Sequence, residues 1–172
     1  LLAHTVVLGG PVTSVSVLAQ LKKNIIAAYT AETYFGGHGY SVMNTKLRNL
    51  EECPPLTPAA QLLHHAVSDL AALPEYGYDG DVYRAMRLPP ELVAKYRVEQ
   101  DTKLNLISWP GFTSCTRDPE TCLGFVDDWD LNVVFVIRGG GQRLRPMRIE
   151  EWSQHPEELE VLYDLGQQFE IM

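Results

Sequence analysis

The sequence predicts an α+β fold, with helices in the first half of the chain and short strands in the second. Three stretches before residue 74 carry apolar residues at the spacing of core-facing helices. From residue 77 onward, glycines and prolines separate short segments rich in β-branched and aromatic residues, which is typical of strands. Because helices and strands form two groups and do not alternate, we expect an α+β arrangement.

The three helices are expected at residues 15–30, 40–50 and 57–73. Pro54-Pro55 ends the second helix, and Thr57 followed by Pro58 is a favoured N-cap and first turn for the third. The positions expected to face the core are Val15, Val17, Leu18, Leu21, Ile25, Ile26 and Tyr29, then Val42, Met43 and Leu47, then Leu62, Leu63, Ala66, Leu70 and Leu73.

Strands are expected at residues 81–86, 104–109 and 131–137, with a short helical turn at 91–96. The segment 131–137, LNVVFVI, is so apolar that we expect both of its faces to be covered. The glycines at 139–141 lack the spacing of a dinucleotide-binding loop, so we interpret them as a hairpin turn.

Composition limits the class of protein. A chain of 172 residues can bury a sizeable core, and we expect residues 1–172 to form a single domain. A net charge of −8 argues against nucleic acid or an anionic membrane as the partner, and no segment is long enough to span a membrane. The chain opens on leucine, so we interpret it as an excised domain of a larger or secreted protein, or as a processed product.

The three cysteines predict neither a disulfide scaffold nor a metal site. Their number is odd and none form a CxxC pair, so we expect no metal and favour a reducing compartment, with one bridge plus a free thiol as the alternative. Cys115 is a conceivable nucleophile, but no histidine is close in sequence. His64-His65 cannot chelate one metal from adjacent helix positions. Residues 127–130 lack the pattern of a calcium loop and are interpreted as a solvated connection.

Three polar side chains lie within the predicted strands or directly after them. Arg84 is in the middle of the strand 81–86, where an arginine is costly unless it has an anionic partner. Its fork of donors suits a phosphate, and a structural ion pair is the alternative. Ser114 and Thr116 share a face if the chain is extended, where they can bind a carboxylate or a sugar hydroxyl, or lie on the surface.

The pair Glu158 and Glu160 admits two interpretations. In a strand the two carboxylates lie on one face, where one can stabilise a cationic centre while the other activates a nucleophile. Alternatively, Ser153 caps a helix that runs to Gly166, which would place the two glutamates on nearly opposite faces. Both interpretations fit the segment taken alone.

Four stretches of the chain, in this order, resemble the mono-ADP-ribosyltransferases of the arginine-serine-glutamate class, the group of cholera-toxin-like toxins and vertebrate arginine-specific transferases. They are Tyr29-Thr30 with residues 40–48, Val82–Met86, Phe112–Thr116 and Glu158–Leu162. A lone glutamate-x-glutamate is common, whereas the ordered set is more specific. The chain departs from the pattern at Ala85, where many members have glycine, and at Cys115, where threonine is usual.

The resemblance implies two small packed sheets around a cleft for NAD, which is a substrate, and a strand at residues 158–163. By this resemblance Arg84 holds a phosphate of NAD and the backbone of Ala85 lies near the nicotinamide carboxamide. Ser114 and Thr116 belong to the NAD site, where Ser114 orients Glu160. Glu160 stabilises the ribosyl cation that forms when the nicotinamide bond breaks.

The resemblance also implies an acceptor protein that carries a target arginine. Glu158 would pair with the guanidinium and help to deprotonate it. We expect residues 149–155 to form the acceptor-recognition loop, with Trp152 either a stacking contact or a core anchor. Two other functions stay open: an NAD glycohydrolase that uses the same site with water as acceptor, and a catalytically inactive interaction domain of the same fold. Nucleic acid as acceptor is disfavoured by the charge of −8.

Overall fold

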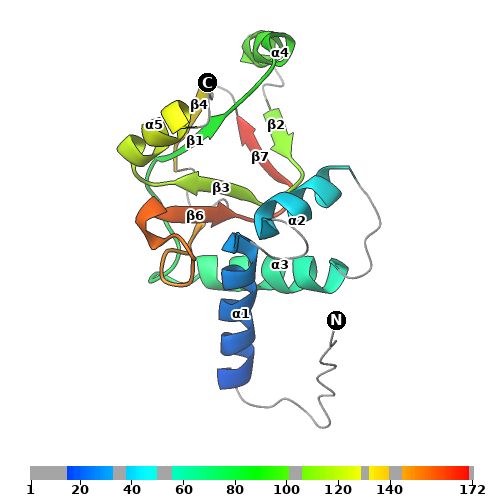
Figure 1. Ribbon diagram of the computed structural model, residues 1–172, viewed down its shortest axis with the longest axis vertical. Helices are drawn as coiled ribbons and strands as arrows, with labels where there is room; N and C mark the ends of the chain where they lie inside the picture. Colours follow the sequence, from blue (N-terminus) through cyan, green and yellow to red (C-terminus); the bar gives the residue numbers. More distant parts are fainter. Residues whose placement is uncertain are drawn as a thin grey trace.

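The computed structural model describes residues 15–32, 38–49, 56–100, 106–128, 132–139 and 145–170. It has the predicted α+β fold, with helices first and strands after them (Figure 1). Cys53, Trp129, Asp130, Gly140 and Gly141 lie outside the described residues, so the hairpin expected at 139–141 is described only at Gly139. Within the described part of the chain, no helix has the length and apolar character needed to cross a membrane.

The three predicted N-terminal helices are confirmed as α1 (Val15–Thr30), α2 (Gly39–Arg48) and α3 (Thr57–Ala71). The expected inner faces are only partly right. Val17 and Leu21 are exposed, because the first half of α1 extends beyond the body of the molecule (Figure 1). Leu73 follows the end of α3 and is also exposed, and the N-cap of α3 is Leu56 in place of the predicted Thr57.

The strands form two antiparallel sheets. The five-stranded sheet has the order β4-β1-β3-β6-β5, and the two-stranded sheet pairs β2 with β7. The strands are β1 (Val82–Met86), β2 (Leu106–Trp109), β3 (Thr113–Thr116), β4 (Val133–Ile137), β5 (Met147–Arg148), β6 (Glu160–Tyr163) and β7 (Gln167–Glu170).

Three expectations about the second half were wrong. The turn expected at 91–96 is a full helix, α4 (Pro90–Gln100). A helix that the sequence analysis did not predict, α5 (Pro119–Asp128), packs against β1 and β3 and includes part of the expected solvated connection. Strand β4 is a sheet edge with Val134 and Val136 exposed, so its two faces are not both covered.

The side chains of β6 separate two hydrophobic cores. Leu162 points to the larger core, where α1, α2 and α3 pack together with Phe112, Met147 and Ile149. Val161 and Tyr163 point the other way, to a smaller core that they form with Val82, Ile107, Cys115 and Phe169. Since β2 and β7 contribute Ile107 and Phe169, this smaller core joins the two sheets. The alternation fixes which side chains of β6 face the helices and which face the second sheet.

Candidate functional site

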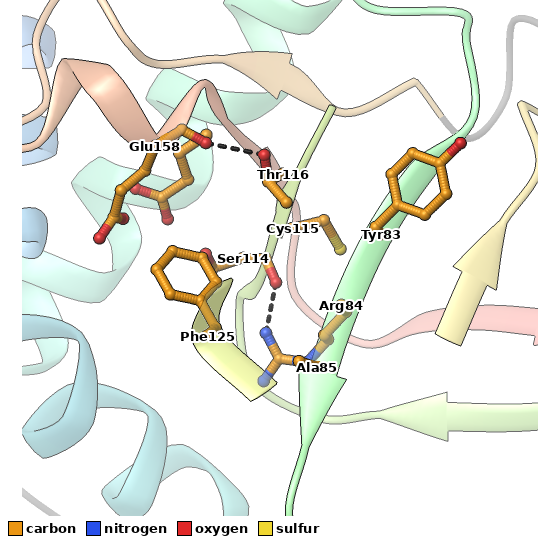
Figure 2. A pocket seen from close by; sticks show the side chains of 9 residues that line it. Tyr83, Arg84, Ala85, Ser114, Cys115, Thr116, Phe125 and Glu158 are labelled. Carbon is orange, nitrogen blue, oxygen red and sulfur yellow. Dashed lines mark hydrogen bonds between the residues drawn. The ribbon is translucent and has the colours of Figure 1, made fainter. Parts of the chain in front are cut away.

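The candidate site lies where β1 and β3 separate. These neighbouring strands pair only at Tyr83 and Thr116, whereas β1 pairs with β4 along its whole length. The guanidinium of Arg84 bridges the gap by donating a hydrogen bond to the carbonyl oxygen of Ser114 (Figure 2). An arginine side chain thus satisfies a carbonyl that a regular ladder would have paired with backbone. The sheet opens here without leaving that oxygen unpaired.

A cleft with a volume of about 620 Å³ extends from this gap toward the helices, which is within the range of small-molecule binding sites. It brings together four of the predicted site residues, Arg84, Ala85, Ser114 and Glu160, and a fifth, Glu158. A smaller recess of about 110 Å³ shares these five and adds Thr116 (Figure 2). The remaining predicted residue, Trp152, does not line either space.

Arg84 is equipped to bind an anion. Its side chain is half-buried, its guanidinium carbon lies 5.6 Å from the centre of the Trp109 ring, and its Nε is buried without a hydrogen-bond partner among the described residues. A buried donor without a partner is costly, and a phosphate oxygen would satisfy it. The structural ion pair that the sequence left open is not seen within the described residues, where the recorded hydrogen bond of Arg84 is to a carbonyl.

Glu160 is the first residue of β6 and the buried carboxyl of the cleft. Only 7% of it is exposed, and this burial raises its pKa from 4.5 to about 7. A hydrogen bond with Ser114 and the charge of Arg84 oppose this rise in pKa, while the charge of Glu158 adds to it. Near neutral pH the group is therefore balanced between its carboxylic acid and carboxylate forms. Such a perturbed carboxyl in a cleft is typical of a catalytic group.

Glu158 reaches the same cleft by a route that the sequence did not predict. The strand expected at 158–163 begins only at Glu160, because Pro156–Glu158 forms a 3-10 turn and Leu159 has a left-handed backbone with φ 49°. The alternation within a strand therefore does not account for the position of Glu158. The turn holds it in the cleft instead, where burial raises its pKa.

Thr116 fixes the turn before β6. Its hydroxyl donates to the carbonyl oxygen of Glu158 at 2.7 Å (Figure 2). The same hydroxyl accepts from the backbone N–H of Asp118 at 3.1 Å. The hydroxyl expected to take part in an NAD site is thus already engaged with the protein. Its contact is to the backbone of a residue that lies in the cleft, so it supports the position of Glu158.

Trp152 is packed at the edge of the larger core. Its ring lies 4.9 Å from that of Tyr76, and the Lys23 ammonium is 5.5 Å from the ring centre. Of the two roles left open for Trp152, the core anchor describes this position. Another residue of the same predicted loop, His155, does line the cleft.

Several cleft residues were not predicted as site residues. Tyr29 is buried and its hydroxyl accepts a hydrogen bond from Asn44 at 3.0 Å, which joins α1 to α2 beneath the cleft. His155 approaches Glu32 at 3.9 Å and Glu157 at 3.5 Å. Phe125 comes from α5, the helix that was missed, so no local pattern placed it near Ser114. Tyr29 and Asn44 were part of the resemblance, which was the one available signal for them.

Cys115 and the candidate metal ligands can be examined in the part of the chain that the structure describes. Cys115 is a buried member of the smaller core that also borders the small recess, and burial raises the pKa of its thiol to about 12. It is therefore protonated at neutral pH and a poor nucleophile. Across residues 15–170, leaving aside the masked gaps, no group of His, Cys, Asp and Glu side chains could hold a metal ion.

Comparison with solved structures identifies the fold. HopU1, an ADP-ribosyltransferase of Pseudomonas syringae pv. Tomato DC3000, superposes with a TM-score of 0.73 at 24% identity, over 87% of this chain and 69% of that one. Exoenzyme S of Pseudomonas aeruginosa was solved with human 14-3-3 protein beta and carba-NAD. It gives a TM-score of 0.62 at 15% identity, over 86% of this chain and 63% of the exoenzyme S chain. The chain thus spans less than two thirds of exoenzyme S.

A third structure, the ADP-ribosyltransferase Vis in complex with agmatine, gives a TM-score of 0.55 at 20% identity, over 95% of this chain and 80% of that one. No protein-family model and no curated protein sequence matches the chain. The α+β fold with two small sheets is thus the fold of solved ADP-ribosyltransferases, and the resemblance predicted from four short motifs is confirmed at the level of the fold.

Proposed function

We propose that this chain is a mono-ADP-ribosyltransferase that moves ADP-ribose from NAD to an arginine side chain of a protein. The observation that carries the proposal is the convergence of Arg84, Ser114 and Glu160, from three different strands, on one cleft. Each lies far from the others in sequence, and the fold alone would not require these residue types there. Exoenzyme S, which has this fold, was solved with an NAD analogue.

On the NAD side, Arg84 binds a phosphate through its fork of donors, and the backbone of Ala85 meets the nicotinamide carboxamide. Ser114 holds the Glu160 carboxyl, and Thr116 holds the backbone beside it. The negative charge of the chain as a whole does not favour NAD, so its phosphates depend on this local arginine.

The reaction begins with cleavage of the bond between the ribose carbon and the nicotinamide nitrogen. Nicotinamide leaves with the electron pair, and the ribose is left with the character of a cation. The Glu160 carboxylate, which is fixed by Ser114 and shielded from water, stabilises that charge as it develops. A nitrogen of the acceptor guanidinium then forms the new bond to the ribose carbon and loses a proton.

Glu158 acts on the acceptor. It is half-buried, lies in the cleft with Glu160, and can pair with a guanidinium in two-point geometry before taking its proton. Arginine as the acceptor residue is supported by agmatine, a small molecule with the same guanidinium group, which was found with Vis. An arginine-bearing protein segment also suits a chain with a net charge of −8.

The decisive experiment uses NAD labelled in the adenylate part, agmatine as a soluble acceptor, and a cell lysate as a source of protein acceptors. We expect labelled agmatine, and labelled protein whose modified side chain maps to arginine. Release of free ADP-ribose with no labelled acceptor would identify a glycohydrolase. Absence of NAD binding by calorimetry would overturn the proposal in favour of an inactive interaction domain.

A further inference from the structure

One position, Arg117, contacts both ends of the loop that carries Glu158. This loop, residues 149–159, leaves β5 and returns as β6, and its neck is closed by a hydrogen bond from Ile149 N–H to the Glu160 carbonyl oxygen at 3.1 Å. Arg117 follows β3 directly. Its guanidinium pairs with Glu150 Oε1 at 3.0 Å near the start of the loop, and its backbone N–H donates to the Leu159 carbonyl oxygen at 3.3 Å near the end.

The ion pair is partly withdrawn from water. The two side chains are 32% and 23% exposed, and the Nε of Arg117 and the Oε2 of Glu150 are buried without hydrogen-bond partners among the described residues. A charged pair that is partly withdrawn from water is stronger than one at the surface, and removal of one partner leaves a half-buried charge uncompensated. The pair is therefore a specific restraint on the loop and not a solvated surface contact.

The two catalytic carboxyls depend on this restraint to different degrees. Glu160 is held within the sheet, where it is paired with Thr116 in the β3–β6 register. Glu158 lies in the loop, outside the sheet, and its backbone is held by the hydrogen bond of its carbonyl oxygen with Thr116, by that of its N–H with the His155 carbonyl oxygen, and by the turn at Leu159. Loosening of the loop would therefore displace Glu158 while Glu160 stays in place.

We propose that Arg117 and Glu150 are positioning residues for the acceptor half of the reaction, and that their ion pair sets the ratio of transfer to hydrolysis by holding Glu158 against the cleft. This inference rests on the proposed function, because it assigns the pair to the arginine-directed step. Neither residue lines the cleft, so both act through Glu158 and not by contact with NAD.

The test compares Arg117→Met, Glu150→Gln and the double variant with the wild-type chain. Nicotinamide release without acceptor reports hydrolysis, and ADP-ribosyl-agmatine formation reports transfer. In each single variant we expect the ratio of transfer to hydrolysis to fall about tenfold, with the KM for NAD within about twofold of wild type. The double variant should lose no more than the single variants, because the two residues act as one unit.

Arg97→Met, on the exposed face of α4, is the matched control and should leave the ratio of transfer to hydrolysis unchanged.

Hydrogen exchange supplies a readout that does not depend on activity. We expect faster amide exchange in residues 149–159 of Arg117→Met, and no change there in Arg97→Met. An unchanged loop or an unchanged ratio would overturn the inference, as would equal loss of transfer and hydrolysis. If wild-type protein does not cleave NAD, the proposed function fails, and the exchange experiment still decides whether the ion pair holds the loop.

Discussion

Arg84 and Ser114 are joined across the gap where the neighbouring strands β1 and β3 stop pairing. The guanidinium of Arg84 donates a hydrogen bond to the Ser114 carbonyl oxygen. The Ser114 side chain forms a hydrogen bond with the Glu160 carboxyl in the same cleft. An arginine that serves as a strand bridge before the ligand arrives is already oriented at the gap. Part of the ordering cost of binding is thereby met in the free protein.

The bridge predicts a specific defect in Arg84→Lys. A lysine keeps the charge but cannot present the planar fork that reaches both a phosphate and the Ser114 carbonyl. We expect the KM for NAD to rise by about tenfold to a hundredfold, with unchanged far-ultraviolet circular dichroism. Arg87→Lys, an exposed arginine after the same strand, serves as the control. A KM for NAD equal to that of wild type would remove Arg84 from the NAD site.

Glu160→Gln is expected to slow both transfer and NAD hydrolysis severely. The amide keeps the size of the side chain and can still contact Ser114, but it carries no charge to stabilise the ribosyl cation. Transfer and NAD hydrolysis should both fall by about 10² to 10³, which is roughly 3 to 4 kcal/mol of transition-state stabilisation. Nicotinamide release by purified protein measures the effect, and normal turnover would exclude Glu160 as the catalyst.

The same carboxyl predicts how stability and activity depend on pH. Its pKa is about 7 in the folded protein and 4.5 without burial, so the folded state binds the proton more tightly. The contribution of Glu160 to the free energy of unfolding is greatest below pH about 4.5. It falls by up to roughly 3 kcal/mol as the pH rises to about 7. Activity should rise over the upper part of this range, because the carboxylate form is the one that stabilises a cation.

Denaturant unfolding of Glu160→Gln measures the stability effect. The variant should be more stable than wild type above pH about 7, and the difference should vanish toward pH about 4.5. Glu151→Gln, at an exposed glutamate of the same loop, should show no such trend. A difference in the free energy of unfolding that does not change with pH would show that Glu160 is not the buried acid described here.

Glu158→Ala separates the two halves of the reaction. The variant should lose transfer to arginine because no carboxylate remains to pair with the guanidinium and take its proton, and it should keep part of its NAD hydrolysis. The loss of a general base typically costs about 10² to 10⁴ in rate. Assays with agmatine and with water as the acceptor, on one protein preparation, report the two rates. Equal loss of both would refute the division of roles between Glu158 and Glu160.

The sequence predicted the parts of the fold whose signals are local. Helices α1, α2 and α3 follow from apolar periodicity and from proline and glycine breaks, and β1 from a short apolar run between turns. Helix α5 was missed because its stripe is short, Gly124 interrupts it, and its acidic end suggested a loop. Strand β4 was predicted as buried because LNVVFVI is apolar throughout, yet its position at the sheet edge is set by tertiary pairing.

The geometry of the candidate site likewise could not be predicted from local sequence signals. The motif around Glu160 identified the carboxyl pair, but its geometry depends on the left-handed turn at Leu159, which local propensity does not favour. Thr116 stabilises that turn by a hydrogen bond to the carbonyl oxygen of Glu158, although it lies in a strand more than forty positions earlier in the chain. Arg117 and Glu150 carried no motif at all, since only the fold brings them together.

Gly111 lies at the floor of the cleft, where there is no room for a side chain. A Cβ at this position would lie 2.5 Å from Asn44 Oδ1. Asn44 cannot move away cheaply, since it is 8% exposed and its amide donates to the Tyr29 hydroxyl. Gly111→Ala should therefore break the contact between α1 and α2, cost about 1 to 3 kcal/mol of stability, and raise the KM for NAD.

Gly124→Ala is the matched control, because a Cβ at that position of α5 would meet no atom within 4 Å. Replacing a helical glycine by alanine should stabilise this variant by about 0.5 to 1 kcal/mol. In thermal unfolding, Gly111→Ala should therefore be less stable than wild type and Gly124→Ala more stable. In NAD titration, only Gly111→Ala should bind NAD more weakly. If Gly111→Ala unfolds and binds NAD as wild type does, the buried contact between Asn44 and Tyr29 does not shape the cleft.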